Sequence, residues 1–147
     1  MKIRPGIIVC GLVLAAFTVP FSIYTANAVK GKEAAAQRFK EIHTEELKQL
    51  IDSKKPALIF DARKSITVGV LPGAKHLSYD ADGNTIAKAI GAHPKDYMIV
   101  VYCARVECPL SKYLAENLIS EGYTNVYKYP EGIEAWMKSY PIDRIKS

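Results

Sequence analysis

The stretch YMIVVYCARVECPLS, residues 97–111, contains the strongest strand signal of the chain and runs directly into a helix pattern. Residues 97–103 are almost entirely apolar and predict a strand. Residues 57–63, a short continuous apolar run upstream, predict a strand buried on both faces. The helix pattern consists of an initial proline, three leucines on one face and a final glycine: Pro109, Leu110, Leu114, Leu118 and Gly122. The stretch therefore predicts a strand, a loop over residues 104–108 and a helix.

Further strands and helices alternate on both sides of this stretch. Apolar runs and turn residues predict strands within residues 57–63, 69–80 and 124–129. Helices are expected after a cap at Thr44, after a cap at Asn84, and over residues 131–140. Strands that alternate with helices predict an α/β fold, with a central, mainly parallel sheet flanked by helices.

Residues 1–28 have the composition of a secretory signal peptide. Lys2 and Arg4 precede an uncharged apolar core, and the segment ends in the small-x-small triplet 26–28. The alternative is an uncleaved membrane anchor, because roughly 18 apolar residues can span a bilayer. Pro20 and the exit triplet favour cleavage. We therefore expect an exported protein, periplasmic or anchored in the inner membrane and facing the periplasm.

The rest of the chain divides into a polar linker over residues 29–42 and one domain over residues 43–147. Without the first 28 residues, the chain has 18 basic and 15 acidic residues, a net charge of +3. Because this charge is small and dispersed, no nucleic-acid partner is expected. Membrane contact is expected only through the N-terminal segment if it stays uncleaved. Cleavage would also remove Cys10, leaving Cys103 and Cys108 in an exported protein, where disulfides persist.

Cys103 ends the most apolar strand, and in parallel sheets ligands gather beyond the carboxyl ends of strands. Amides of the 104–108 loop and the N-terminus of the next helix would direct their positive ends at this thiol and favour its thiolate. Arg105 adds a nearby positive charge. The pattern predicts a nucleophilic cysteine in an anion-holding loop. The alternative is a cysteine that only fills the strand end.

Other cysteine chemistries fit the spacing less well. A metal site needs roughly four ligands, and no cluster of His or Cys accompanies Cys103 and Cys108, so we expect neither a metal nor a cofactor. A phosphatase-like loop would have an arginine at the position of Pro109. A dithiol oxidoreductase normally has two residues between its cysteines, whereas four separate these.

Four segments together resemble the single-domain rhodaneses, a family of sulfurtransferases. They are LIFDAR (58–63), GVLPGAKHL (69–77), IVVYC (99–103) and GYTNVYKYPEGIEAWMKSYPI (122–142). Each piece alone is weakly specific, but four in the family's order are specific, and the resemblance spans about residues 42–142. It implies a rhodanese-like three-layer fold with Cys103 as the catalytic residue.

The resemblance also implies an enzyme with a two-step mechanism. The Cys103 thiolate would take sulfane sulfur from a small anionic donor such as thiosulfate, become a persulfide, and pass the sulfur to a thiol acceptor. The loop would bind the donor through Ala104, Arg105, Val106, Glu107 and Cys108. Two other functions stay open: a non-catalytic sulfur carrier or binding module, and a periplasmic thiol-redox protein that uses both cysteines.

The active loop departs from the common family pattern at Cys108, where many relatives have Arg or Lys. The sequence is similar to a subset that reads Cys-x4-Cys-x2-Ser, matched by Cys103, Cys108 and Ser111. The missing cation puts a preference for thiosulfate in doubt, and Arg105 either replaces it or is solvated. Cys108 has three interpretations: a bystander, a residue that resolves an oxidised or persulfidated Cys103, or one half of a stable disulfide.

Two residues at the end of the 57–63 strand could support the site. Asp61 either orients the active loop or, as strand-end aspartates commonly do, pairs with Arg63 or caps backbone amides.

His76, in the 69–77 segment, could shuttle protons, but a half-buried packing role suits it better.

Overall fold

The computed structural model describes residues 39–144, so the predicted signal peptide or anchor and most of the predicted linker lie outside the described residues. Its centre is a five-stranded sheet in which every strand pairs in parallel, in the order β1-β5-β4-β2-β3. The strands are β1 (Lys40–Glu41), β2 (Leu58–Asp61), β3 (Lys75–His76), β4 (Ile99–Tyr102) and β5 (Val126–Tyr129). The predicted parallel sheet is confirmed.

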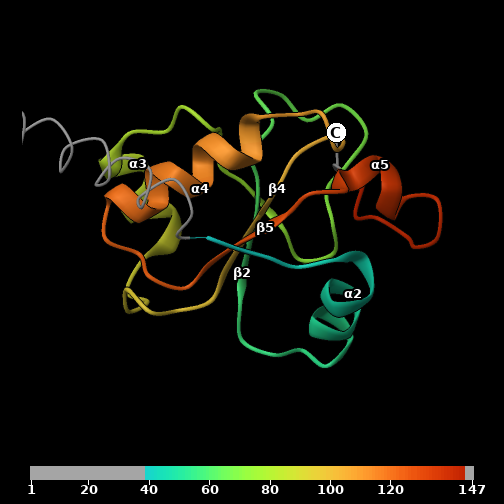
Figure 1. The fold of residues 1–147 in the computed structure, drawn as a ribbon, viewed down its shortest axis with the longest axis horizontal. Coiled ribbons are helices and arrows are strands. Elements are labelled where there is room, and N and C mark those ends of the chain that lie inside the picture. Colours follow the sequence, from blue (N-terminus) through green and yellow to red (C-terminus); the bar gives the residue numbers. More distant parts are fainter. Residues whose placement is uncertain (1–38, 145–147) are drawn as a thin grey trace, which may run out of the picture.

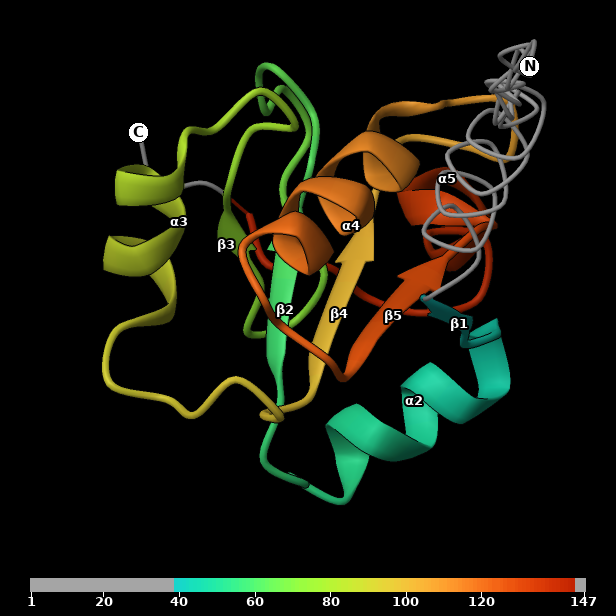
Figure 2. The same cartoon turned by 60° about the vertical axis from the view of Figure 1, so that its left-hand side comes forward.

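Helices cover both faces of this sheet, as predicted (Figures 1 and 2). They are α2 (Thr44–Asp52), α3 (Gly83–Ile90), α4 (Leu110–Ser120) and α5 (Gly132–Trp136). Helices α3 and α4 lie on one face, and α2 and α5 lie on the other (Figure 2). None of the helices within residues 39–144 is long and apolar enough to cross a bilayer.

Strand β4 is buried on both faces because its residues supply both halves of the core. Val101 belongs to the cluster under α3 and α4, whereas Val100 and Tyr102 belong to the cluster under α2 and α5. Side chains of a strand alternate between the two faces of a sheet, so a central strand must be apolar at every position. This requirement explains the continuous apolar run in the sequence. Because β4 is the central strand, its end lies in the middle of the carboxyl edge of the sheet.

Two helix caps differ from the sequence prediction. Thr44 is the first helical residue of α2 rather than its cap, and its hydroxyl makes a hydrogen bond with the Tyr129 hydroxyl at 2.9 Å. In α3 the cap is Asp82 rather than Asn84, because the Asp82 carboxylate accepts from the Thr85 amide at 2.7 Å. An aspartate just upstream thus starts the helix earlier than the asparagine would.

Strand β1 was not expected from the sequence, which predicted a linker through residue 42. Lys40 and Glu41 pair in parallel with Tyr127 and Lys128 of β5. Both β1 residues are exposed, so this edge strand has no alternation of apolar and polar residues. Its strand character depends on backbone pairing with β5 and left no pattern in the sequence.

Candidate active site around Cys103

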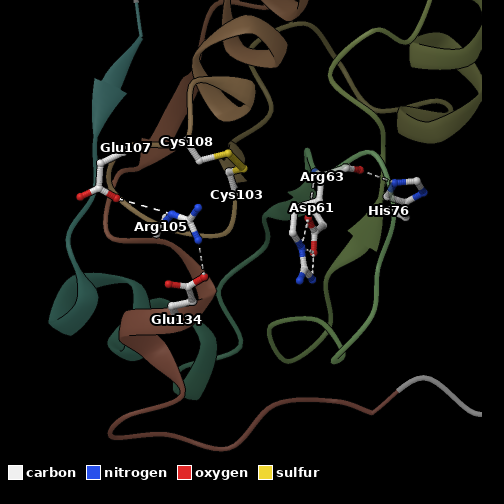
Figure 3. Close-up of a disulfide and its surroundings, with 8 residues drawn as sticks. All are labelled: Asp61, Arg63, His76, Cys103, Arg105, Glu107, Cys108 and Glu134. Carbon is white, nitrogen blue, oxygen red and sulfur yellow. Dashed lines mark hydrogen bonds and ion pairs between the residues drawn. A yellow bond between two sulfur atoms is a disulfide. The ribbon is translucent and has the colours of Figure 1, made fainter.

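Cys103 follows β4 directly, at the carboxyl edge of the sheet, and its side chain is buried, with 1% exposure. The loop then curls back so that Cys108, which is half-buried, forms a disulfide with Cys103 (Figure 3). The two Cα atoms are 6.2 Å apart, within the usual range for a disulfide. The structure therefore brings together the two cysteines that the sequence left with several possible relationships.

Helix α5 holds the start of the loop through the backbone. The Ile133 amide donates to the Cys103 carbonyl oxygen at 3.0 Å, and the Glu134 amide donates to the Ala104 carbonyl oxygen at 2.9 Å. These amides belong to the first turn of α5, where they have no partner within the helix. The loop thus satisfies the N-terminus of α5, and α5 determines where the backbone of Cys103 and Ala104 lies.

Gly132 makes this contact between helix and loop possible. A Cβ atom at this position would lie 2.6 Å from the Ala104 carbonyl carbon and oxygen and 2.7 Å from the Arg105 amide nitrogen. Gly132 also has a φ of +73°, which side chains other than glycine rarely adopt. The sequence resemblance included Gly132 but gave it no role in the site. An isolated glycine at the start of a helix was the one local signal of a close backbone approach.

The remaining loop backbone is free to bind an anion. The Cys108 amide donates to the Arg105 carbonyl oxygen at 3.0 Å, which closes the turn. Within residues 39–144, the amides of residues 104–107 donate to no protein acceptor. Helix α4 begins at Leu110, immediately after the loop, and its N-terminus carries a partial positive charge. Free amides next to a helix N-terminus are suited to hold negative charge.

Arg105 does not direct an uncompensated charge at the cysteines. Its side chain is 62% exposed and pairs with Glu134 at 3.2 Å and with Glu107 at 3.7 Å (Figure 3). The negative charges of these two carboxylates therefore offset the positive charge of the guanidinium on the outside of the loop. The neighbouring Val106 is 64% exposed. Ser111 is buried, with 2% exposure, in the first turn of α4.

Asp61 and Arg63 form a buried ion pair at the end of β2. The Arg63 side chain donates from Nε to both Asp61 carboxylate oxygens, at 2.9 and 3.0 Å, and its terminal nitrogen donates to the Gly69 carbonyl oxygen at 2.5 Å. The Arg63 amide also donates to Asp61, at 3.0 Å. The sequence left two roles open for Asp61, orienting the active loop or pairing with Arg63 and capping backbone amides. In the structure, Asp61 pairs with Arg63 and accepts from its backbone amide.

Burial lowers the pKa of Arg63, but the hydrogen bonds and charge of Asp61 outweigh this effect, so its pKa is raised overall. The same carboxylate acts on Tyr102, the residue before Cys103. Burial and the negative charge of Asp61 both raise the pKa of Tyr102, so its hydroxyl stays neutral. The hydroxyl accepts a hydrogen bond from the Leu71 amide at 3.0 Å. This group of residues fixes the end of β2 against the end of β4.

His76 is placed differently from the half-buried packing role that we predicted. Its side chain is exposed, because β3 is the edge strand of the sheet, and Nε2 lies 2.7 Å from the Arg63 carbonyl oxygen. In Figure 3, His76 lies beyond the Asp61–Arg63 pair, on the side away from the disulfide. It therefore contacts the backbone of Arg63 rather than the cysteine loop.

Residues 43–139 match the Rhodanese family, described as the rhodanese-like domain. The chain belongs to this family. Among curated proteins, the thiosulfate sulfurtransferase GlpE of Pseudomonas aeruginosa is 29% identical over 105 residues, which cover 71% of this chain and 90% of that protein. The family match over residues 43–139 includes β2, β4, the cysteine loop and α5, so the whole site lies within the rhodanese-like domain.

Solved structures agree with this assignment. A rhodanese-like domain protein from Staphylococcus aureus is 27% identical, covers 74% of this chain and 100% of its own, and has a TM-score of 0.57. The Alr3790 protein from Anabaena has a TM-score of 0.60 at 21% identity, covering 71% of this chain and 80% of its own. The second likeness shows the fold alone.

Proposed function

We propose that this rhodanese-like protein is a sulfurtransferase that carries sulfane sulfur as a persulfide on Cys103. The observation that carries the proposal is the position of Cys103 at the end of β4, at the base of a loop whose amides at residues 104–107 have no acceptor within the described chain. The similarity to GlpE, named a thiosulfate sulfurtransferase, supports the same class of reaction.

In the first step of this proposal, the Cys103 thiolate attacks the outer sulfur of a donor such as thiosulfate. A bond forms between Cys103 Sγ and that sulfur while the sulfur–sulfur bond of the donor breaks. The electron pair of the broken bond leaves with sulfite, and Cys103 becomes a persulfide. The loop amides hold the negative charge of the donor and then of the persulfide, and they need little reorganisation because α5 has already positioned the loop.

In the second step, an acceptor thiolate attacks the outer sulfur of the persulfide. The acceptor becomes the persulfide and the Cys103 thiolate is restored, so the cycle needs no external oxidant or reductant. The Cys103–Cys108 disulfide stands outside this cycle, because Cys103 in the disulfide is no nucleophile. A dithiol must first reduce it, supplying two electrons and becoming a disulfide itself.

Persulfide loading tests the proposal directly. The chain is reduced with a dithiol, freed of reductant and mixed with thiosulfate, and its intact mass and the released sulfite are measured. The Cys108→Ser variant is expected to gain one sulfur atom that cyanide removes, with one sulfite released per chain. The Cys103→Ser variant is expected to gain none. If neither wild type nor Cys108→Ser releases sulfite from thiosulfate or gains sulfur from a polysulfide, the protein is a binding module rather than a sulfurtransferase.

A further inference from the structure

The position of Cys108 has a chemical consequence beyond sulfur transfer. Its Sγ reaches the Sγ of Cys103, and the Cα atoms of the two residues are 6.2 Å apart. The Cys108 amide is held by the Arg105 carbonyl oxygen at 3.0 Å, and Pro109 starts α4 directly afterwards. Cys108 is therefore held beside Cys103 by local backbone structure, and this structure does not depend on the bound donor.

We propose that Cys108 resolves the Cys103 persulfide, so that the protein releases hydrosulfide and ends each such turnover as the disulfide. The proposal rests on the proposed function, because it needs a persulfide on Cys103. It gives the same site a second product: sulfane sulfur is reduced to hydrosulfide instead of being passed on unchanged. Cys108 becomes a catalytic residue, because its sulfur forms the new bond.

The step balances within the protein. The Cys108 thiolate attacks the inner sulfur of the persulfide, which is Cys103 Sγ, and the disulfide bond forms. The bond between Cys103 Sγ and the outer sulfur breaks, and its electron pair leaves with the outer sulfur as hydrosulfide. The two cysteines lose two electrons and the sulfane sulfur gains them, while the proton of hydrosulfide comes from solvent or from the Cys108 thiol.

The geometry favours attack at the inner sulfur over transfer of the outer sulfur to Cys108. The structure has Cys108 Sγ bonded to Cys103 Sγ itself, so this approach is available without rearrangement of the loop. The outer sulfur carries the negative charge of the persulfide, and the free amides of residues 104–107 are the groups that can hold it. Those amides would also stabilise hydrosulfide as it leaves.

An external acceptor must compete with this intramolecular thiol. A group held next to its target reacts as if present at a very high concentration, whereas a free acceptor must first bind at the loop. Resolution by Cys108 therefore prevails unless an acceptor binds specifically at the loop. The released disulfide returns to the dithiol form by reaction with a dithiol reductant. Because Cys108 is the more accessible cysteine, that reductant is expected to attack Cys108 and to free Cys103.

A single-turnover experiment without added thiol tests the proposal. The full chain is reduced, desalted under argon and mixed with thiosulfate, which contains no free sulfide. Sulfite, sulfide and intact protein mass are followed over time. Wild type, Cys108→Ser and Val68→Ser are compared. Val68 lies outside the cysteine loop and is 50% exposed, so Val68→Ser controls for a serine substitution that keeps both thiols and the loop.

Wild type and Val68→Ser are expected to release about one sulfite and one hydrosulfide per chain and to finish two hydrogens lighter than the reduced protein. Cys108→Ser is expected to release sulfite, to keep the persulfide, and to release at least tenfold less hydrosulfide. A stable persulfide on wild type would overturn the inference, as would equal hydrosulfide release from Cys108→Ser. Absence of sulfite and of persulfide from every variant would instead overturn the proposed function.

Discussion

The ends of β2 and β4 lie side by side at the same edge of the sheet, with Asp61 and Tyr102 in register, yet their polar groups are arranged in opposite ways. At the end of β2, Asp61 and Arg63 satisfy one another and the nearby backbone. At the end of β4, the loop after Cys103 leaves the amides of residues 104–107 without protein acceptors in the described chain. The first arrangement stabilises the fold, and the second is available for an anion.

One sheet edge can thus combine a rigid support with a reactive group. Buried polar groups normally have hydrogen-bond partners, and the buried end of β2 follows this rule. The loop after β4 departs from it where the chain reaches the surface, and there α5 holds the backbone from the other side. Five predictions, in order of decreasing effect, test these two arrangements and the contacts around them.

Cys103→Ser is expected to abolish persulfide loading, because a serine hydroxyl is not deprotonated near neutral pH and cannot carry sulfane sulfur. The fold should persist, since the substitution keeps the size of a side chain at the end of β4. Loading is measured by intact mass after thiosulfate, and folding by circular dichroism. Sulfur that cyanide removes from the Cys103→Ser variant would show that another group carries it.

Asp61→Ala is expected to lower the free energy of unfolding by about 3–5 kcal/mol, because it leaves the Arg63 guanidinium buried without its partner. Urea unfolding measures this change. The matched control is Glu116→Ala, which breaks the exposed Lys112–Glu116 pair and should cost about 0–1 kcal/mol. Folded Asp61→Ala protein should still load sulfur on Cys103. Equal losses for the two variants would contradict the structural role of the buried pair.

Gly132→Ala is expected to lower the free energy of unfolding by about 1–3 kcal/mol and to slow persulfide loading, because the new Cβ must displace the backbone of Ala104 and Arg105. Gly73→Ala is the control: Gly73 has nearly the same φ, +74°, but nothing lies within 4 Å of its Cβ position. Both variants should lose stability, and only Gly132→Ala should lose loading rate. Normal loading by Gly132→Ala would argue that α5 does not position the loop.

Arg105→Gln is expected to change the rate of loading from thiosulfate by less than about fivefold, because two carboxylates already offset this exposed charge. Glu134→Gln should instead speed loading modestly by leaving more of the Arg105 charge free to attract an anion. Rates of sulfite release at low and high salt measure both effects. A large loss in Arg105→Gln would mean that Arg105 turns toward the donor and replaces the family's usual cation.

The smallest expected effect is a pH dependence of stability at the N-terminus of α2. A hydrogen bond to Glu131, at 2.6 Å, and the charge of Glu131 raise the pKa of exposed His43. Protonated His43 therefore stabilises the folded state most below its ordinary pKa of 6.5, and this contribution is lost as the pH rises through the raised value. Urea unfolding from pH 5 to 8 should detect it in wild type and not in Glu131→Gln. An unchanged profile in Glu131→Gln would contradict this origin.

Sequence patterns predicted most of the framework. The apolar run before Cys103 identified the central strand, and the leucine spacing after Pro109 identified α4. The predicted caps at Thr44 and Asn84 were wrong. In α3 the cap is Asp82, which has the same capping ability as an asparagine. In α2 the cap position is taken by His43, which is not a usual capping residue type. Export of the domain stays a prediction.

The strand–loop–helix order around Cys103 follows from local sequence alone, because apolar spacing and turn residues are local properties of the chain. Contacts between distant segments were established by tertiary packing. It placed the first turn of α5 against the loop and gave Arg105 its partner Glu134. Such contacts depend on how the sheet and helices pack, since a hydrogen bond forms only over a narrow range of distances, which residue spacing along the chain does not specify. The Cys103–Cys108 disulfide is local in sequence, but it depends on how the loop curls in space, because a bridge needs the two Cα atoms within a limited separation.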